Sequence, residues 1–170
     1  QSTGTAIDKA GLTNGDLHVL NIPSVKSDNL FRTTVGKNKK VAAEFVKVDW
    51  NTSTALFAKE SREKGTTMAR VEDGHWDPSN PNVFYFVTTE SNKDPIATAP
   101  NPATPTVTRD GGALWRLRFA DVSNPAKGGT LELLLDGSEA PLLSKPDNIT
   151  VDGAGNVLIQ EDPGNNALVA

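Results

Sequence analysis

Short apolar runs separated by turn residues dominate the pattern of hydrophobic and polar positions. Residues 16–22 alternate apolar and polar side chains directly after the turn dipeptide Asn14-Gly15, which predicts a half-buried strand. Residues 41–50 end with Phe45, Val46, Val48 and Trp50 and predict another strand. These two runs indicate a fold made largely of β-strands.

Three further runs strengthen the β prediction in the second half of the chain. Residues 82–89 are rich in aromatic and β-branched side chains, as buried strands are. Residues 112–119 place Arg116 and Arg118 on the face opposite Trp115, so this strand is expected to be half exposed. Residues 130–135 form the third run.

One helix is predicted, at residues 54–64. Asn51 or Ser53 can cap its start, and Gly65 ends it. Because strands surround it on both sides, we interpret it as an insertion on a β fold. The proline-rich stretch at residues 93–109 allows two interpretations, a segment for polyproline recognition or a long surface loop, and the loop is favoured.

An internal repeat decides the expected architecture. Residues 70–77 align with residues 145–152 at a spacing of 75, so that Asp77 falls on Asp152. After a turn that is one residue shorter, Asn82 is expected to fall on Asn156. Each copy is a short strand, a turn and a longer strand, and two more strands complete the first copy. This is the pattern of a four-stranded propeller blade.

The predicted fold class is therefore all-β, a β-propeller of four-stranded antiparallel blades with one short inserted helix. We expect a partial propeller domain divided into an incomplete blade (residues 1–50), a helical insertion (51–65), a complete blade (66–140) and the start of the next blade (141–170). Closed propellers have about 4–8 blades, whereas these amount to about three. The remaining blades are therefore expected from the same parent chain or from a partner chain.

Acidic and amide side chains recur where each innermost strand begins. They are Glu72 with Asp73, and Asp147 with Asn148. Oxygen ligands that converge from several blades suit Ca²⁺, which takes about six to eight of them. The alternative is that these side chains cap turns by accepting hydrogen bonds from backbone N–H groups. The sequence leaves both interpretations open.

Composition narrows the function classes. A net charge of −4 disfavours a nucleic-acid surface, which needs clustered lysines and arginines. The chain has no cysteine, so disulfides, thiolate ligands and cysteine nucleophiles are excluded within it. No apolar run reaches the length of about 18 residues that a membrane span requires. Residues from Gln1 onward show no basic-then-apolar signal pattern, which still allows export with the signal removed or outside this chain.

The repeat also carries a family resemblance. Residues 70–78, 80–89, 145–152 and 156–162 resemble the PhoX family of bacterial alkaline phosphatases, and the resemblance spans residues 66–170. It implies a six-bladed propeller that holds calcium and iron (Ca²⁺ and Fe³⁺) in its mouth and hydrolyses phosphate monoesters. It also implies a periplasmic or extracellular location.

The resemblance implies roles for particular residues. Glu72 lies in the family's Arg-x-Glu element and would bind metal and act in catalysis; Asp147 would bind calcium, and Glu161 and Asp162 are further metal-ligand candidates. The family's cysteine iron ligand is missing, and its arginine and glutamate motif for substrate would lie beyond Ala170.

Three functions therefore remain to be compared. The first is a metal-dependent phosphomonoesterase. The second is a non-catalytic propeller in which Ca²⁺ ties blades together and a face binds a partner. The third is a hydrolase of another ester or a lactone, which would keep the acidic mouth but need no phosphate-binding arginine. A shared fold does not choose among them.

Overall fold

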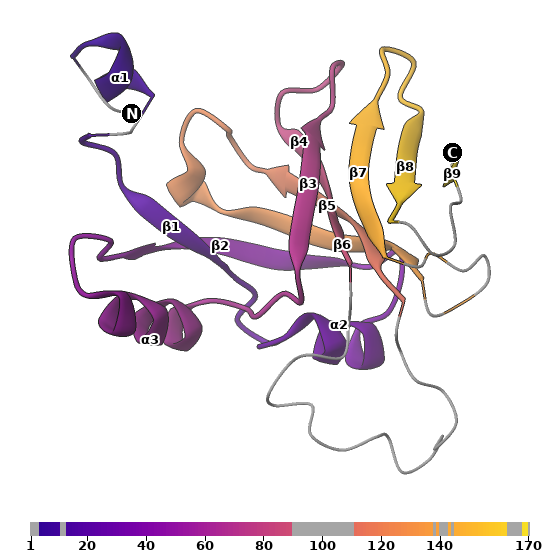
Figure 1. Ribbon diagram of the computed structural model, residues 1–170, viewed down its shortest axis with the longest axis horizontal. Coiled ribbons are helices and arrows are strands. Elements are labelled where there is room, and N and C mark those ends of the chain that lie inside the picture. The colour runs from indigo at the N-terminus through magenta and orange to yellow at the C-terminus, as the bar shows by residue number, and fades with distance from the viewer. Residues whose placement is uncertain are drawn as a thin grey trace.

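The computed structural model describes residues 4–10, 13–89, 111–137, 139, 143, 145–162 and 168–169. Two antiparallel sheets and a few short helices make up this part of the chain (Figure 1). The all-β prediction is confirmed, and the sheets are consistent with partial propeller blades. The proline-rich stretch at residues 93–109 lies outside the described residues, so neither interpretation of it is tested.

The first sheet has six strands in the order β1-β2-β6-β5-β4-β3, and the second has three in the order β7-β8-β9. The strands of the first are β1 (Leu17–Asn21), β2 (Lys40–Val48), β3 (Val71–Trp76), β4 (Val83–Thr88), β5 (Ala113–Phe119) and β6 (Gly129–Asp136). Those of the second are β7 (Pro146–Val151), β8 (Val157–Glu161) and β9 (Leu168–Val169).

Strands β3 to β6 form the expected four-stranded meander, in which each strand pairs with the next along the chain. The antiparallel pair of β1 and β2 extends this sheet, because β2 pairs with β6 through Val41 opposite Leu131. The first two strands thus share a sheet with the next four. Where one blade ends and another begins stays a prediction.

The helices are short and lie at the margins of the sheets. The predicted helix is α3 (Thr54–Lys64), where the Ser53 hydroxyl accepts a hydrogen bond from the Leu56 N–H at 3.4 Å. The chain also forms α1 (Ala6–Lys9), α2 (Asp28–Thr34) and the 3₁₀ helix η1 (Pro125–Lys127), none of which we expected from the sequence. No helix in the described ranges is long and apolar enough to cross a membrane.

The repeat is visible in two equivalent hairpins. The Asp77 N–H donates to the Val83 carbonyl at 2.9 Å, and the Asp152 N–H donates to the Asn156 carbonyl at 3.0 Å. Asp77 and Asp152 are therefore equivalent, as the sequence predicts. Val83, however, falls on Asn156, so the second turn is two residues shorter than the first. The expected match of Asn82 with Asn156 is wrong by one residue, because a length difference in the turn does not show in the strand pattern.

Both hairpin aspartates hold their turns in the same way. The Asp77 carboxylate accepts from the Ser79 N–H at 2.8 Å, and the Asp152 carboxylate accepts from the Ala154 N–H at 2.9 Å. Hydrogen bonds from Ser79 lower the pKa of Asp77, and hydrogen bonds from Asn156 chiefly lower the pKa of Asp152. The support that these carboxylates give their turns is therefore present above the ordinary Asp pKa and is lost as the pH falls through the lowered one.

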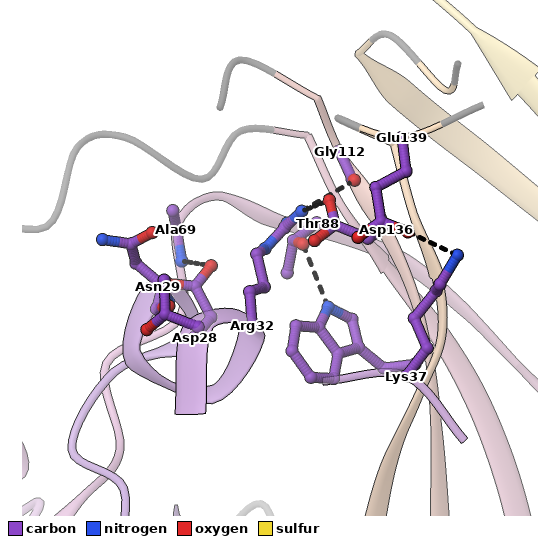
Figure 2. Close-up of polar contacts among 11 residues, drawn as sticks. Asp28, Asn29, Arg32, Lys37, Ala69, Thr88, Gly112, Asp136 and Glu139 are labelled. Carbon is purple, nitrogen blue, oxygen red and sulfur yellow. Dashed lines mark hydrogen bonds and ion pairs between the residues drawn. The ribbon is translucent and has the colours of Figure 1, made fainter. Parts of the chain in front are cut away.

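One hydrophobic core lies between the six-stranded sheet and α2. Trp115 is fully buried there and meets Phe31 edge to face, with ring centroids 5.3 Å apart. A buried ion pair fixes the same helix, because Arg32 Nη1 lies 2.7 Å from Asp136 Oδ1 and also donates to the Gly112 carbonyl (Figure 2). The helix is therefore held by tertiary contacts more than by its own seven residues.

A second core joins the two sheets. It contains Val87 and Leu114 from the first sheet, Ile149 and Ile159 from the second, and Leu143 between them. These side chains are 8% exposed or less, so the contact excludes water. The junction places β7 directly beside β3, which brings the two copies of the repeat together.

Candidate metal centre

Strands β3 and β7 are the equivalent first strands of the two copies, and they lie side by side and run in the same direction (Figure 1). The Ile149 N–H of β7 donates to Asp73 Oδ2 of β3 at 3.0 Å. This hydrogen bond joins the two strands near their first residues. Glu72 and Asp147 are each the second residue of their strand. The two candidate ligands thus start neighbouring strands at the same end.

Both strands carry a β-bulge where they start. Val71 lies opposite Thr88 and Gly74 opposite Phe86, so Glu72 and Asp73 together face a single residue of β4. Pro146 lies opposite Glu161 and Asn148 opposite Gln160, so Asp147 is the extra residue of β7. With the spacing of 75, Glu72 and Asp147 occupy the same bulged position. Bulges re-aim side chains and are frequent beside active sites.

A second backbone irregularity precedes each bulge. Arg70 has a φ of 50° and Lys145 a φ of 48°, both in the left-handed region that few residues other than glycine adopt. Their carbonyls accept equivalent hydrogen bonds, from the Thr89 N–H at 3.0 Å and from the Asp162 N–H at 2.9 Å. The same left-handed residue conformation therefore precedes both strands and sets the direction in which each begins. Such conformations cost about 1–3 kcal/mol each and cluster at functional sites.

Glu72 presents a carboxylate that solvent can reach. Its side chain is 27% exposed, and its Oε1 lies 3.1 Å from Arg70 Nη2. The guanidinium of Arg70 is itself about half exposed. A carboxylate and a guanidinium thus form an ion pair at the start of β3. The sequence shows the recurring basic residue but not its contact with Glu72, because the contact depends on the left-handed corner at Arg70.

The other acidic and amide candidates make backbone and local bonds. Asp73 uses both oxygens, since Oδ1 accepts from the Gly74 N–H at 2.8 Å and Oδ2 from the Ile149 N–H. The side-chain amide of Asn148, which is exposed, donates to Asp147 Oδ2 at 3.1 Å. The sequence left metal binding and backbone capping open for these positions, and Asp73 does accept backbone bonds.

Glu161 and Asp162 lie at the same end of the second sheet. Glu161 is opposite Pro146 in the pairing of β8 with β7, and it is 5% exposed. The backbone N–H of Asp162 bonds to the Lys145 carbonyl. The fold therefore brings all six predicted residues to one end of three strands. Within the described ranges, no group of three or more His, Asp or Glu side chains is close enough to hold a metal ion.

The donor chemistry can be tested against the ions that the family implies. Glu72 and Asp147 supply hard carboxylate oxygens, which calcium prefers, on two strands that lie side by side where the two sheets meet. A thiolate ligand for iron has no counterpart in this sequence. These carboxylate oxygens are of the type that calcium binds, whereas no residue of this sequence supplies the thiolate of a cysteine-ligated iron site.

An antiparallel β fold in which two neighbouring strands begin with bulged carboxylates is consistent with partial propeller blades. Residues 10–169 match the family model described as alkaline phosphatase PhoX. Because this match covers nearly the whole chain, the chain belongs to the PhoX family. No curated protein and no solved structure gave a significant match.

Proposed function

We propose that this protein is a metal-dependent phosphomonoester hydrolase of the PhoX type, with its metal ions held at the propeller mouth. Family membership implies alkaline phosphatase-type activity. The observation that carries the proposal is the identical bulged position of Glu72 and Asp147 in two neighbouring inner strands. The family also supports a periplasmic or extracellular location.

Glu72 and Asp147 are the residues we propose as calcium ligands, and Glu72 is the one we also place in catalysis. Asn148, Glu161 and Asp162 are the further ligand candidates, whereas Asp73, which the sequence also offered as a ligand, has both carboxylate oxygens bonded to backbone N–H groups. A bound cation would neutralise phosphate oxygens and favour attack by an oxygen nucleophile. It would also offset the repulsion between the carboxylates. An iron ion in this chain would have no cysteine ligand.

Arg70 is proposed to orient the phosphate group. Its guanidinium is 46% exposed and lies 3.1 Å from the Glu72 carboxylate, so a phosphate held at Glu72's metal would be within its reach. Guanidinium groups bind phosphate with two parallel hydrogen bonds, which fixes the orientation of the ester. The ion pair with Glu72 would in turn hold Arg70 in place before substrate arrives.

A non-catalytic propeller is the second candidate. The observation that favours it is the position of the acids at the seam between two blades, where an ion would tie the blades together. In that case the protein would bind calcium and a partner but release no phosphate. A hydrolase of another ester or a lactone is the third, and it would not depend on Arg70.

Hydrolysis assays on the intact protein separate these functions. We expect p-nitrophenyl phosphate to be hydrolysed, the activity to disappear on chelation, and Ca²⁺ to restore it. A calcium-dependent melting temperature without hydrolysis of any ester would support the non-catalytic propeller. Hydrolysis of p-nitrophenyl acetate but not of the phosphate would identify the third function. Phosphatase activity that is unchanged by exhaustive chelation, with no metal left, would contradict the proposal.

A further inference from the structure

We propose that Asp73 is a positioning residue that locks two blades together and thereby sets the spacing of the bulged carboxylates, without binding the metal itself. This inference rests on the proposed function, because it concerns the metal centre at Glu72 and Asp147. It assigns different tasks to the two adjacent acids at the start of β3. Glu72 would hold the ion, and Asp73 would hold the neighbouring strand.

The first argument is the hydrogen bonding of Asp73. Among the described residues, β7 is an edge strand of its sheet, so its outward N–H groups have no strand partner there. Ile149 is 6% exposed, and a buried N–H without a partner is costly. Asp73 Oδ2 accepts the bond from this N–H at 3.0 Å, while Oδ1 accepts from the Gly74 N–H. Asp73 thus gives the Ile149 N–H, on the edge of β7, a hydrogen-bond acceptor from the neighbouring strand β3.

The second argument comes from comparing the two copies of the repeat. The bulged position holds a carboxylate in both, Glu72 and Asp147. The next position holds Asp73 in one copy and Asn148 in the other. Asp and Asn share an oxygen acceptor of the same reach but differ in charge. A negative charge is therefore common to the bulged position but not to the next one, where Asp73 accepts from a backbone N–H and the amide of Asn148 donates to Asp147.

The third argument is the short path between the two bulges. Asp73 follows Glu72 directly, and Ile149 lies two residues after Asp147. One hydrogen bond of 3.0 Å therefore links the backbone segments that carry the two proposed ligands. Asn148 supports the same centre from the other side, because its amide donates to Asp147 Oδ2. Groups that orient a metal ligand change metal affinity by about 10- to 100-fold when they are removed.

The same chemical change made at two adjacent positions tests this assignment. Asp73→Asn and Glu72→Gln each replace a carboxylate by an amide, which keeps one of the two oxygen acceptors. In Asp73→Asn that oxygen is expected to accept from the Ile149 N–H, and the Gly74 N–H loses its side-chain bond. We expect Asp73→Asn to keep calcium affinity within about threefold, whereas Glu72→Gln loses at least about tenfold. Asp73→Ala removes the acceptor, so its calcium affinity should fall by about 10- to 100-fold and the Ile149 amide should exchange with solvent at least about tenfold faster.

Calcium titration and residue-resolved hydrogen exchange on the intact protein provide the measurements. If Asp73→Asn lost as much calcium affinity as Glu72→Gln, Asp73 would be a ligand and the assignment would be overturned. Unchanged exchange at Ile149 in Asp73→Ala would overturn the lock between the blades. If Asp73→Ala does not fold, Asp73→Asn against Glu72→Gln decides alone. A wild-type protein that binds no calcium would refute the proposed function, and exchange at Ile149 would still decide the lock.

Discussion

Replacing Glu72 by alanine is expected to lower kcat/KM for a phosphate monoester on the order of 100-fold or more and to weaken calcium binding, while the protein stays folded. The expected loss is functional because the Glu72 side chain is partly exposed and belongs to neither hydrophobic core. Its ion pair with Arg70 is a surface pair, and such pairs contribute about 0–1 kcal/mol. Steady-state kinetics, metal analysis and the melting temperature measure the three effects.

Glu63→Ala is a matched control for this change. Glu63 is also an exposed glutamate beside a cation, Lys59, with a separation of 3.9 Å, but it lies on α3 away from the strand starts. We expect it to leave activity and metal content unchanged. Metal content and activity that are equal in Glu72→Ala and the wild type would remove Glu72 from the site.

Replacing Asp136 by alanine is expected to lower the free energy of unfolding by about 3–5 kcal/mol. The side chains of Arg32 and Asp136 are 0% and 2% exposed, and the ion pair between them is 2.7 Å long. Within the described part of the chain, the Nε and Nη2 atoms of Arg32 are already buried without a hydrogen-bond partner. Without Asp136 the guanidinium would keep only the Gly112 carbonyl and the face of Trp115, whose centroid is 6.0 Å away. Urea unfolding measures the change.

A control variant and a double variant accompany the Asp136→Ala experiment. Glu139→Ala breaks the neighbouring pair with Lys37, whose side chains are 52% and 34% exposed, and should cost at most about 1 kcal/mol (Figure 2). The double change Arg32→Met with Asp136→Leu should recover most of the lost stability, because apolar side chains need no buried counterion. A loss of under about 1 kcal/mol in Asp136→Ala would show that the ion pair does not anchor α2.

The sequence pattern predicts those elements whose signals are local. Strands β4, β5 and β6 follow alternating or β-branched runs, and α3 lies between a serine cap and a glycine stop. Helix α2 escaped prediction because it has only seven residues and ends in two threonines, and its support comes from Phe31 and Arg32 packing under the sheet. The pairing of β2 with β6 joins segments that are far apart in the sequence, so no pattern within either strand predicts it.

For the candidate site, as for the fold, the sequence predicts the local features and not those that depend on contacts between strands. The repeat places Glu72, Asp73, Asp147 and Asn148 at the starts of two inner strands, and the structure brings those strands together. The bulges were not predictable, because each depends on how many residues the partner strand sets opposite it. The bond from Ile149 to Asp73 likewise depends on the meeting of two blades and not on either segment alone.

The most direct test of a shared metal centre is a double-mutant cycle on calcium affinity in the intact protein. Glu72→Gln and Asp147→Asn are measured singly and together by calorimetric titration. If both carboxylates bind one ion, each single change weakens calcium binding and the double change weakens it by clearly less than the sum of the two free-energy losses. Losses that add within about 0.3–0.5 kcal/mol would indicate independent sites, and unchanged affinity in both single variants would contradict a calcium centre at these bulges.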